Sequence, residues 1–160
     1  MPQTRPKESV WDYPRPPRVE PEARRVRIEL GGETIAESDR ALRVLETASP
    51  PTVYVPRADV RDGVLSRPTG HNSFCEWKGR AGYLHAVAGG KRAEHAAWFY
   101  AEPREGFEAL RDHVAFYAGR VDAAYLDDEP VTPQGGSFYG GWVTAEIEGP
   151  YKGEPGTEGW

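Results

Sequence analysis

The sequence predicts a mainly β protein: one small domain of twisted antiparallel sheets with one or two short helices. The first observation behind this prediction is strict alternation of apolar and polar residues over 26–30, which is typical of a half-buried strand. The second is the glycine pair at 31–32, after which residues 34–36 are again β-rich, as in a hairpin. A chain of 160 residues is long enough to bury a core without disulfides or metal.

The same signals define the other elements. Further strands are predicted where β-branched and aromatic residues gather between glycine and proline punctuation, at 41–47, 52–55, 69–77, 82–87, 92–100, 116–117 and 121–126. Gly89–Gly90 predicts a second hairpin turn, and Asp127–Asp128 another turn. A short helix is expected over residues 103–109, with one or two helical turns within 58–65.

The ends of the chain differ from its middle. Residues 1–22 form a proline-rich arm, 23–133 the β-rich core domain, and 134–160 an arm of glycines and aromatics that packs on the core. We expect the first arm to pack Trp11 and Tyr13 onto its own domain. The alternative is that the Pro14 to Pro17 spacing is a ligand for a partner domain.

Composition narrows the class of protein. The net charge of −5, from 20 basic and 25 acidic residues, argues against a nucleic-acid-binding protein. A single cysteine rules out a disulfide within the chain and a cysteine-based zinc cluster, and no apolar run is long enough to span a membrane. We therefore expect a cytoplasmic protein with no membrane partner, no metal and no cofactor. Arginine outnumbers lysine beside abundant Ala, Gly and Pro, which suggests a GC-rich bacterial genome.

Five motifs carry a family resemblance. In chain order they are Trp11-Asp12-Tyr13-Pro14-Arg15-Pro16-Pro17, Arg43-Val44-Leu45-Glu46-Thr47, Phe74-Cys75-Glu76-Trp77-Lys78-Gly79, Phe138-Tyr139-Gly140-Gly141-Trp142 and Gly149-Pro150-Tyr151-Lys152-Gly153. Together they resemble domain of unknown function family 427 over nearly the whole chain. The resemblance implies a β-tent-like fold, here without the zinc that four cysteines hold in many β-tent proteins. It also brings a nucleotidyltransferase-like label.

The third motif is the most distinctive and holds the candidate catalytic residues. Glu76 is our candidate general base, because a neighbouring indole can desolvate its carboxylate and move its pKa toward neutrality. Cys75 is a candidate nucleophile if His71 or His85 serves as its base, and the alternative is a buried, inert thiol.

The large number of Trp and Tyr residues predicts a ligand pocket, since these side chains suit partly solvated clefts. Its expected walls and polar contacts are Arg43, Glu46, Tyr54, Trp77, Lys78, Trp98, Tyr100 and Trp142. β-tent relatives bind small ligands in aromatic-walled clefts, which is an analogy at the level of the fold. The predicted function is therefore binding of an unidentified small polar or heteroaromatic molecule, with catalysis left open.

Two other functions stay open. One is a non-catalytic interaction module that docks a partner or a second copy through its arms, which would make a homodimer. The other is metal-dependent nucleotidyl transfer, which ranks last because Gly136-Ser137 is followed by no carboxylate pair and Asp127-Asp128-Glu129 is typical of a solvated turn.

Overall fold

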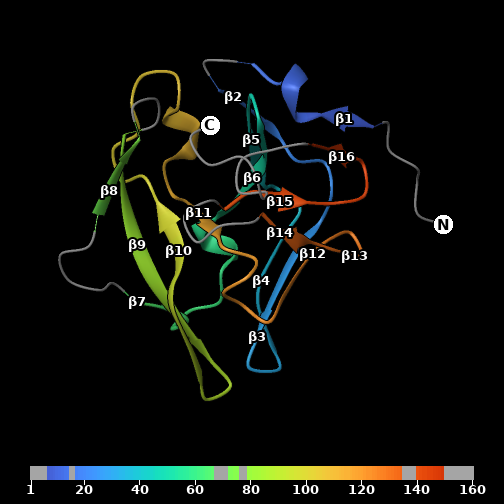
Figure 1. Cartoon of the computed structure of the whole chain (residues 1–160). Helices are drawn as coiled ribbons and strands as arrows, with labels where there is room; N and C mark the ends of the chain where they lie inside the picture. Colours follow the sequence, from blue (N-terminus) through green and yellow to red (C-terminus); the bar gives the residue numbers. More distant parts are fainter. Residues whose placement is uncertain (1–6, 15–16, 67–71, 76–78, 135–139, 150–160) are drawn as a thin grey trace.

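Two antiparallel sheets build the molecule, with two short strand pairs beside them (Figure 1). The computed structural model describes residues 7–14, 17–66, 72–75, 79–134 and 140–149. Within these residues the larger sheet has eight strands. In spatial order these are β2 (Arg18–Pro21), β5 (Leu42–Glu46), β6 (Ser49–Pro56), β11 (His113–Phe116), β10 (Lys91–Phe99), β9 (Gly79–Ala88) and β7 (Leu65–Ser66), with β8 (Asn72–Cys75) also paired to β9.

The smaller sheet has four strands in the described part of the chain. Their order is β13 (Glu129–Pro130), β12 (Ala123–Leu126), β3 (Val26–Leu30) and β4 (Glu33–Ser38). The short pairs are β1 (Glu8–Ser9) with β16 (Ile147–Glu148), which is parallel, and β14 (Thr132–Pro133) with β15 (Trp142–Val143), which is antiparallel. The mainly β prediction is confirmed.

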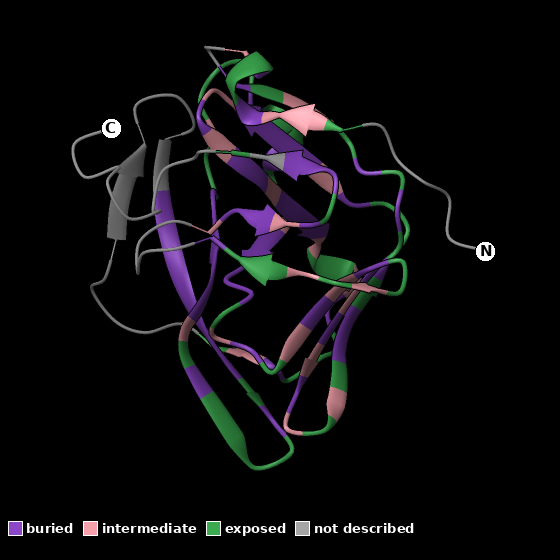
Figure 2. Cartoon of the chain, turned by 45° about the vertical axis from the view of Figure 1, so that its right-hand side comes forward, coloured by how far each residue is buried: buried purple, intermediate pink, exposed green. Residues whose placement is uncertain are grey.

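The main core lies between the two sheets. Alternate residues of β3 and β12, such as Ile28 and Leu126, meet alternate residues of the larger sheet, such as Val55, Leu84 and Phe116. All are at most 2% exposed. Figure 2 shows the same pattern as buried colour along the facing strands and exposed colour at the hairpin tips. This burial supplies most of the apolar driving force for the fold.

Both predicted glycine turns form, and their tips touch. Gly31 and Gly32 have φ of 62° and 78°, and Gly89 and Gly90 have φ of 56° and 76°, as a two-residue hairpin turn of type I′ requires. A Cβ placed on Gly31 would lie 2.0 Å from the carbonyl oxygen of Ala88, so the β3–β4 and β9–β10 hairpins meet at their ends (Figure 1). The Gly31 N–H also donates to Asp122 Oδ2 at 2.7 Å.

The helix predicted at 103–109 is wrong. The segment holds a single 3-10 turn, η3 (Glu108–Leu110), because Gly106 adopts φ of +93° and interrupts a helical path there. A second 3-10 turn, η2 (Arg57–Asp59), is the only helical structure that forms in the described region 58–65. A third, η1 (Val10–Asp12), lies in the N-terminal arm.

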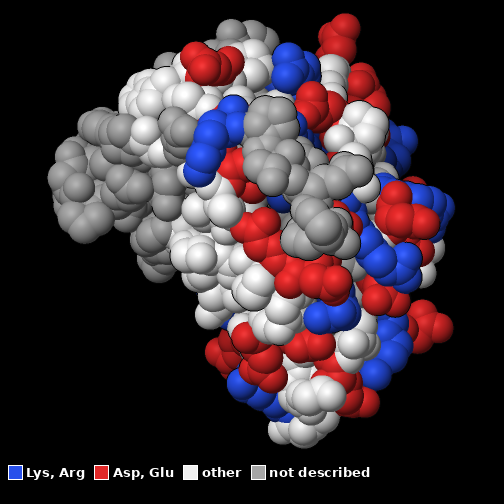
Figure 3. Space-filling model, turned by 90° about the vertical axis from the view of Figure 1, so that its right-hand side faces the viewer, with Lys and Arg blue, Asp and Glu red and all other residues white. Residues whose placement is uncertain are grey.

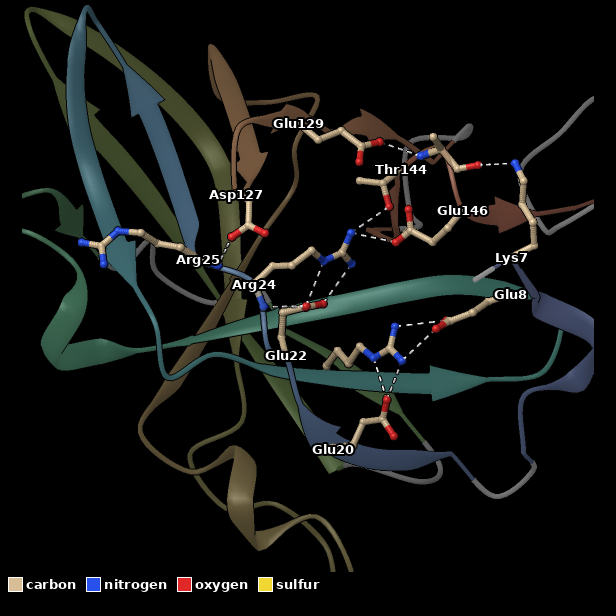
Figure 4. Close-up of polar contacts among 12 residues, drawn as sticks. Lys7, Glu8, Glu20, Glu22, Arg24, Arg25, Asp127, Glu129, Thr144 and Glu146 are labelled. Carbon is tan, nitrogen blue, oxygen red and sulfur yellow. Dashed lines mark hydrogen bonds and ion pairs between the residues drawn. The ribbon is translucent and has the colours of Figure 1, made fainter. Parts of the chain in front are cut away.

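The N-terminal arm is tied to the far end of the chain. Besides the β1–β16 pairing, Arg24 donates to Glu22 at 3.0 Å and to Glu146 at 2.7 Å (Figure 4). These three side chains are at most 7% exposed, and Nη1 of Arg24 also reaches Thr144 Oγ1. We call Arg24, Glu22 and Glu146 the Arg24 cluster.

The predicted packing of the arm holds for one aromatic residue and not for the other. Tyr13 is 8% exposed, packs with Val10 and Leu45, and donates its hydroxyl to Glu8 at 2.7 Å. Trp11 is 47% exposed. Pro14 and Pro17 are described, whereas residues 15–16 between them lie outside the described residues.

Candidate functional site

The outward face of the larger sheet carries an aromatic cluster. On β6, β10 and β11 alternate residues face the main core, so the residues between them point to the other side, where they form a second apolar cluster. Five of its aromatic residues lie on strands of the larger sheet or directly after them. We call these residues the outer aromatic cluster: Tyr54, Tyr83, Trp98, Tyr100 and Tyr117. Phe107 and Leu110, from the segment around η3, pack with it. Sequence reasoning predicted Tyr54, Trp98 and Tyr100, and the structure brings these three together.

The rings contact one another through both edges and hydroxyl groups. Trp98 donates its indole N–H to the Tyr54 hydroxyl at 3.2 Å, and their ring centroids are 6.1 Å apart in an edge-to-face arrangement. The Trp98 ring also lies 4.5 Å from that of Tyr117. A Cβ on Gly140 would come within 2.2 Å of the Trp98 ring, so only glycine fits there at this backbone position. Such pairs stabilise a fixed arrangement of the rings.

A β-bulge makes the polar end of this cluster. Ala93 of β10 pairs with Ala86, but Ala97 pairs with Leu84, so residues 94–96 oppose only His85. At the bulge His95 adopts φ of 50°, a left-handed conformation that is rare for a residue with a Cβ. Its ring centroid lies 4.9 Å from that of His85 and 6.2 Å from that of Tyr83.

Arg120 borders the same end of the cluster. Its guanidinium lies 4.1 Å above the Tyr117 ring and donates to the His95 carbonyl oxygen at 2.7 Å. Arg120 and His95 are half-buried, whereas Tyr83 and Tyr117 are 9% and 8% exposed. A cation, an imidazole and phenol groups therefore surround the part of the cluster nearest solvent. This arrangement can stack on a flat ring and hydrogen-bond a polar substituent.

The Tyr117 hydroxyl should titrate late. Burial raises the pKa of Tyr117 to about 12, helped by the Tyr83 phenol and opposed by Arg120. Because the folded pKa exceeds that of an unfolded tyrosine, near 10, the contribution of Tyr117 to stability is complete below pH 10 and lost toward pH 12. In an absorbance titration of the phenolates, we expect the Tyr117→Phe variant to lack a late-ionising group that wild type shows. A wild-type minus variant difference that ionises near pH 10 would contradict this assignment.

Trp142 does not join the outer cluster. It is 1% exposed, belongs to the main core, and donates its indole N–H to the Phe116 carbonyl oxygen at 2.9 Å. Trp142 is therefore a side chain of the main core and not a wall of the outer aromatic cluster.

Arg43 also lies on the other side of the sheet from Tyr54. The register pairs Arg43 with Val53 and Leu42 with Tyr54, and directly paired residues share a face. The guanidinium of Arg43 binds Glu20 at 2.7 Å and Glu8 at 3.1 Å. Arg43 thus ties the N-terminal arm to β5 rather than meeting the aromatic cluster. Glu46, after the irregularity in β5–β6 pairing, is half-buried opposite Ser49.

The described ends of the motif at 74–79 lie on two paired antiparallel strands instead of one continuous strand. Cys75 ends β8 and pairs with Gly79, the first residue of β9. Glu76, Trp77 and Lys78 lie outside the described residues, as does His71, so their roles stay predictions from the sequence. His85 is six residues beyond Gly79 on the same strand, which corresponds to about 20 Å. That separation is too long for His85 to act as the base for Cys75.

The acidic turn after β12 is placed as expected. Asp127 and Asp128 are exposed in the turn to β13, and Asp127 Oδ1 accepts the Arg25 N–H at 2.9 Å. Within the described ranges no three His, Cys, Asp or Glu residues stand where they could share a metal ion. On the face in Figure 3 acidic and basic side chains are interspersed, without an extended basic area. In the same part of the chain, no helix has the length and hydropathy of a membrane span.

These observations define a small β protein whose larger sheet bears an aromatic cluster on its outward face, with a histidine and arginine rim. Residues 18–127 match the family described as Domain of unknown function (DUF427), and the chain belongs to that family. A comparison with curated proteins found no match. The match covers the strands of both larger sheets except β13, and with them all five members of the outer aromatic cluster.

Sequence reasoning missed part of the polar end. Tyr83 lies in the strand predicted at 82–87. The register of the hairpin around Gly89–Gly90 could have placed it on the same face as Trp98. His95 had no such signal, because it lies inside the bulge, where the alternation of faces along β10 is interrupted. Arg120 lies in the turn after β11, outside any strand pattern.

Proposed function

We propose that this protein binds a small polar heteroaromatic molecule at the rim of the outer aromatic cluster, between the Tyr83 and Tyr117 phenols and the side chains of His95 and Arg120. The observation that supports this most is the concentration of rings with polar ends on the outward face of a sheet. A face that served only to cover the sheet could do so with aliphatic side chains, which carry no groups that need hydrogen bonds.

Geometry supports a planar ligand. Trp98 and Tyr54 are locked by their hydrogen bond and fix the base of the cluster, so the outer rings need little reordering on binding. The guanidinium above Tyr117 and the His95 imidazole offer hydrogen-bond donors at one end of the same surface. A flat ring with a carbonyl, carboxylate or ring nitrogen at its edge matches this combination.

A matched pair of variants tests the proposal. Affinities for indole, benzimidazole, adenine and nicotinic acid would be measured by equilibrium titration against wild type, Tyr117→Leu and Phe99→Leu. Tyr117 belongs to the outer cluster, whereas Phe99, on the neighbouring strand β10, belongs to the main core. We expect at least one probe to bind wild type and to lose affinity about fivefold or more in Tyr117→Leu, the scale of one aromatic contact.

The Phe99→Leu variant controls for general loosening of the sheet. It should bind the same probe as tightly as wild type while being less stable, because Phe99 belongs to the main core and not to the outer aromatic cluster. Equal losses in both variants, or no binding of any probe at millimolar concentration, would count against the outer cluster as a binding site.

A further inference from the structure

His85 supports the strained bulge of β10 from the neighbouring strand. Its Nδ1 atom accepts a hydrogen bond from the backbone N–H of His95 at 3.0 Å. Arg120 holds the carbonyl oxygen of the same residue at 2.7 Å, so both backbone groups of His95 are bound to side chains. Neither of these bonds belongs to the regular sheet ladder, which the bulge interrupts.

The bond from His95 specifies the state of the His85 ring. A backbone N–H can only donate, so Nδ1 of His85 must carry a lone pair, and the neutral ring has its proton on Nε2. The side chain of His85 is 7% exposed, which leaves little water to replace the bond if it breaks. His95 in turn is held at φ of 50°, a conformation that persists only while surrounding contacts impose it.

We infer that His85 is a proton-operated latch on the β10 bulge. Protonation at Nδ1 turns the acceptor into a donor that faces the His95 N–H, so the bond is lost and two donors oppose each other. With that bond gone, the strained backbone of His95 relaxes, and the ring that borders Tyr83 moves with it. The latch is tested between about pH 5 and 8, the range in which histidine side chains ordinarily change charge.

The surroundings of His85 oppose a second positive charge. Among the described residues, β10 contributes His95 and the exposed Glu94, β9 contributes Tyr83, and β7 contributes Ser66, which pairs with His85. Beyond β11, Arg120 reaches the His95 carbonyl and Tyr117 lies beneath that guanidinium. Arg120 is the cation of this set and would repel a protonated His85.

This latch goes beyond ligand binding, because it concerns the backbone of the free protein. It also gives the rim of the outer aromatic cluster two arrangements, one with His85 neutral and one with it protonated. The test therefore reads the bulge directly and needs no ligand, so its failure would leave the binding proposal standing.

The test follows the His95 amide of the full chain by ¹⁵N NMR between pH 5 and 8, in wild type, His85→Asn and His85→Leu. Asparagine carries an acceptor oxygen near the place of Nδ1 and does not titrate in this range, whereas leucine offers no acceptor. Protection of the amide from hydrogen exchange is expressed relative to an unstructured peptide at the same pH.

In wild type we expect a single-proton transition of the His95 resonance and a loss of protection of about tenfold or more toward pH 5. His85→Asn should remain protected at every pH, and His85→Leu should be unprotected at every pH. His113→Asn is the control, because it removes a histidine of β11 that contacts the Arg111 carbonyl oxygen instead of the bulge. This variant should leave the transition unchanged. A loss of protection toward pH 5 that persists in His85→Asn, or a wild-type amide that stays protected at pH 5, would overturn the latch.

Discussion

Replacing Arg24 by leucine should lower the free energy of unfolding by about 3–5 kcal/mol, among the largest effects of any single substitution in this protein. The change removes the cation from the Arg24 cluster and leaves the carboxylates of Glu22 and Glu146 buried without it, at 1% and 4% exposure. Uncompensated buried charge is costly because neither water nor a counter-ion solvates it. Urea denaturation at pH 7 measures the loss.

Arg25 is the matched control for this substitution. It is the next residue and also forms an ion pair, with Glu37 at 3.0 Å, but the side chains of that pair are 55% and 44% exposed. Solvent-exposed pairs contribute about 0–1 kcal/mol, so Arg25→Leu should be nearly neutral. If Arg24→Leu and Arg25→Leu lower the free energy of unfolding equally, the buried ion pairs of the Arg24 cluster contribute no more to stability than an exposed pair.

Replacing Gly31 by alanine should cost about 2–5 kcal/mol, which combines a strained backbone with a collision. Gly31 has φ of 62°, and a Cβ there would lie 2.0 Å from the carbonyl oxygen of Ala88. That oxygen belongs to backbone and cannot rotate away, so the tips of the two hairpins must separate. Thermal and urea unfolding of the purified variant report the cost.

Gly32 separates the two causes. Its φ of 78° imposes the same kind of strain, but no atom lies within 4 Å of a Cβ placed there. Gly32→Ala should therefore lose only about 1–2 kcal/mol, the cost of a left-handed residue with a side chain. Equal losses in Gly31→Ala and Gly32→Ala would show that the contact between the hairpins contributes little to stability.

Local patterns predicted the strands well because each signal acts over a few residues. Alternation at 26–30 and the paired glycines at 31–32 and 89–90 fix hairpins by backbone conformation alone. The helix expected at 103–109 failed because its apolar spacing reflects the packing of Phe107 and Leu110 on the outer cluster, while Gly106 leaves the helical region. Helical spacing of apolar residues does not predict a helix where a residue in the segment leaves the helical backbone conformation.

The candidate site was predictable only in part, for physical reasons. Tyr54, Trp98 and Tyr100 could be recognised by residue type, since large rings with polar ends suit such surfaces. Arg43 was assigned to the same place although it lies on the other face of its strand, because the pairing of β5 with β6 is a long-range property. The carboxylates that bind it, Glu8 and Glu20, are likewise distant in the chain or on another strand.

Chemical-shift mapping tests the central claim, that the outer aromatic cluster binds a small planar molecule, most directly. The probe with the highest affinity for wild type would be titrated into ¹⁵N-labelled protein, and the shifted amides placed on the structure. We predict that the largest shifts fall on Tyr83, His95, Tyr117 and Arg120, around the rim of the cluster. Shifts confined to the exposed Trp11 arm would instead favour an interaction module, and shifts confined to the main core or none at saturating probe would contradict the account.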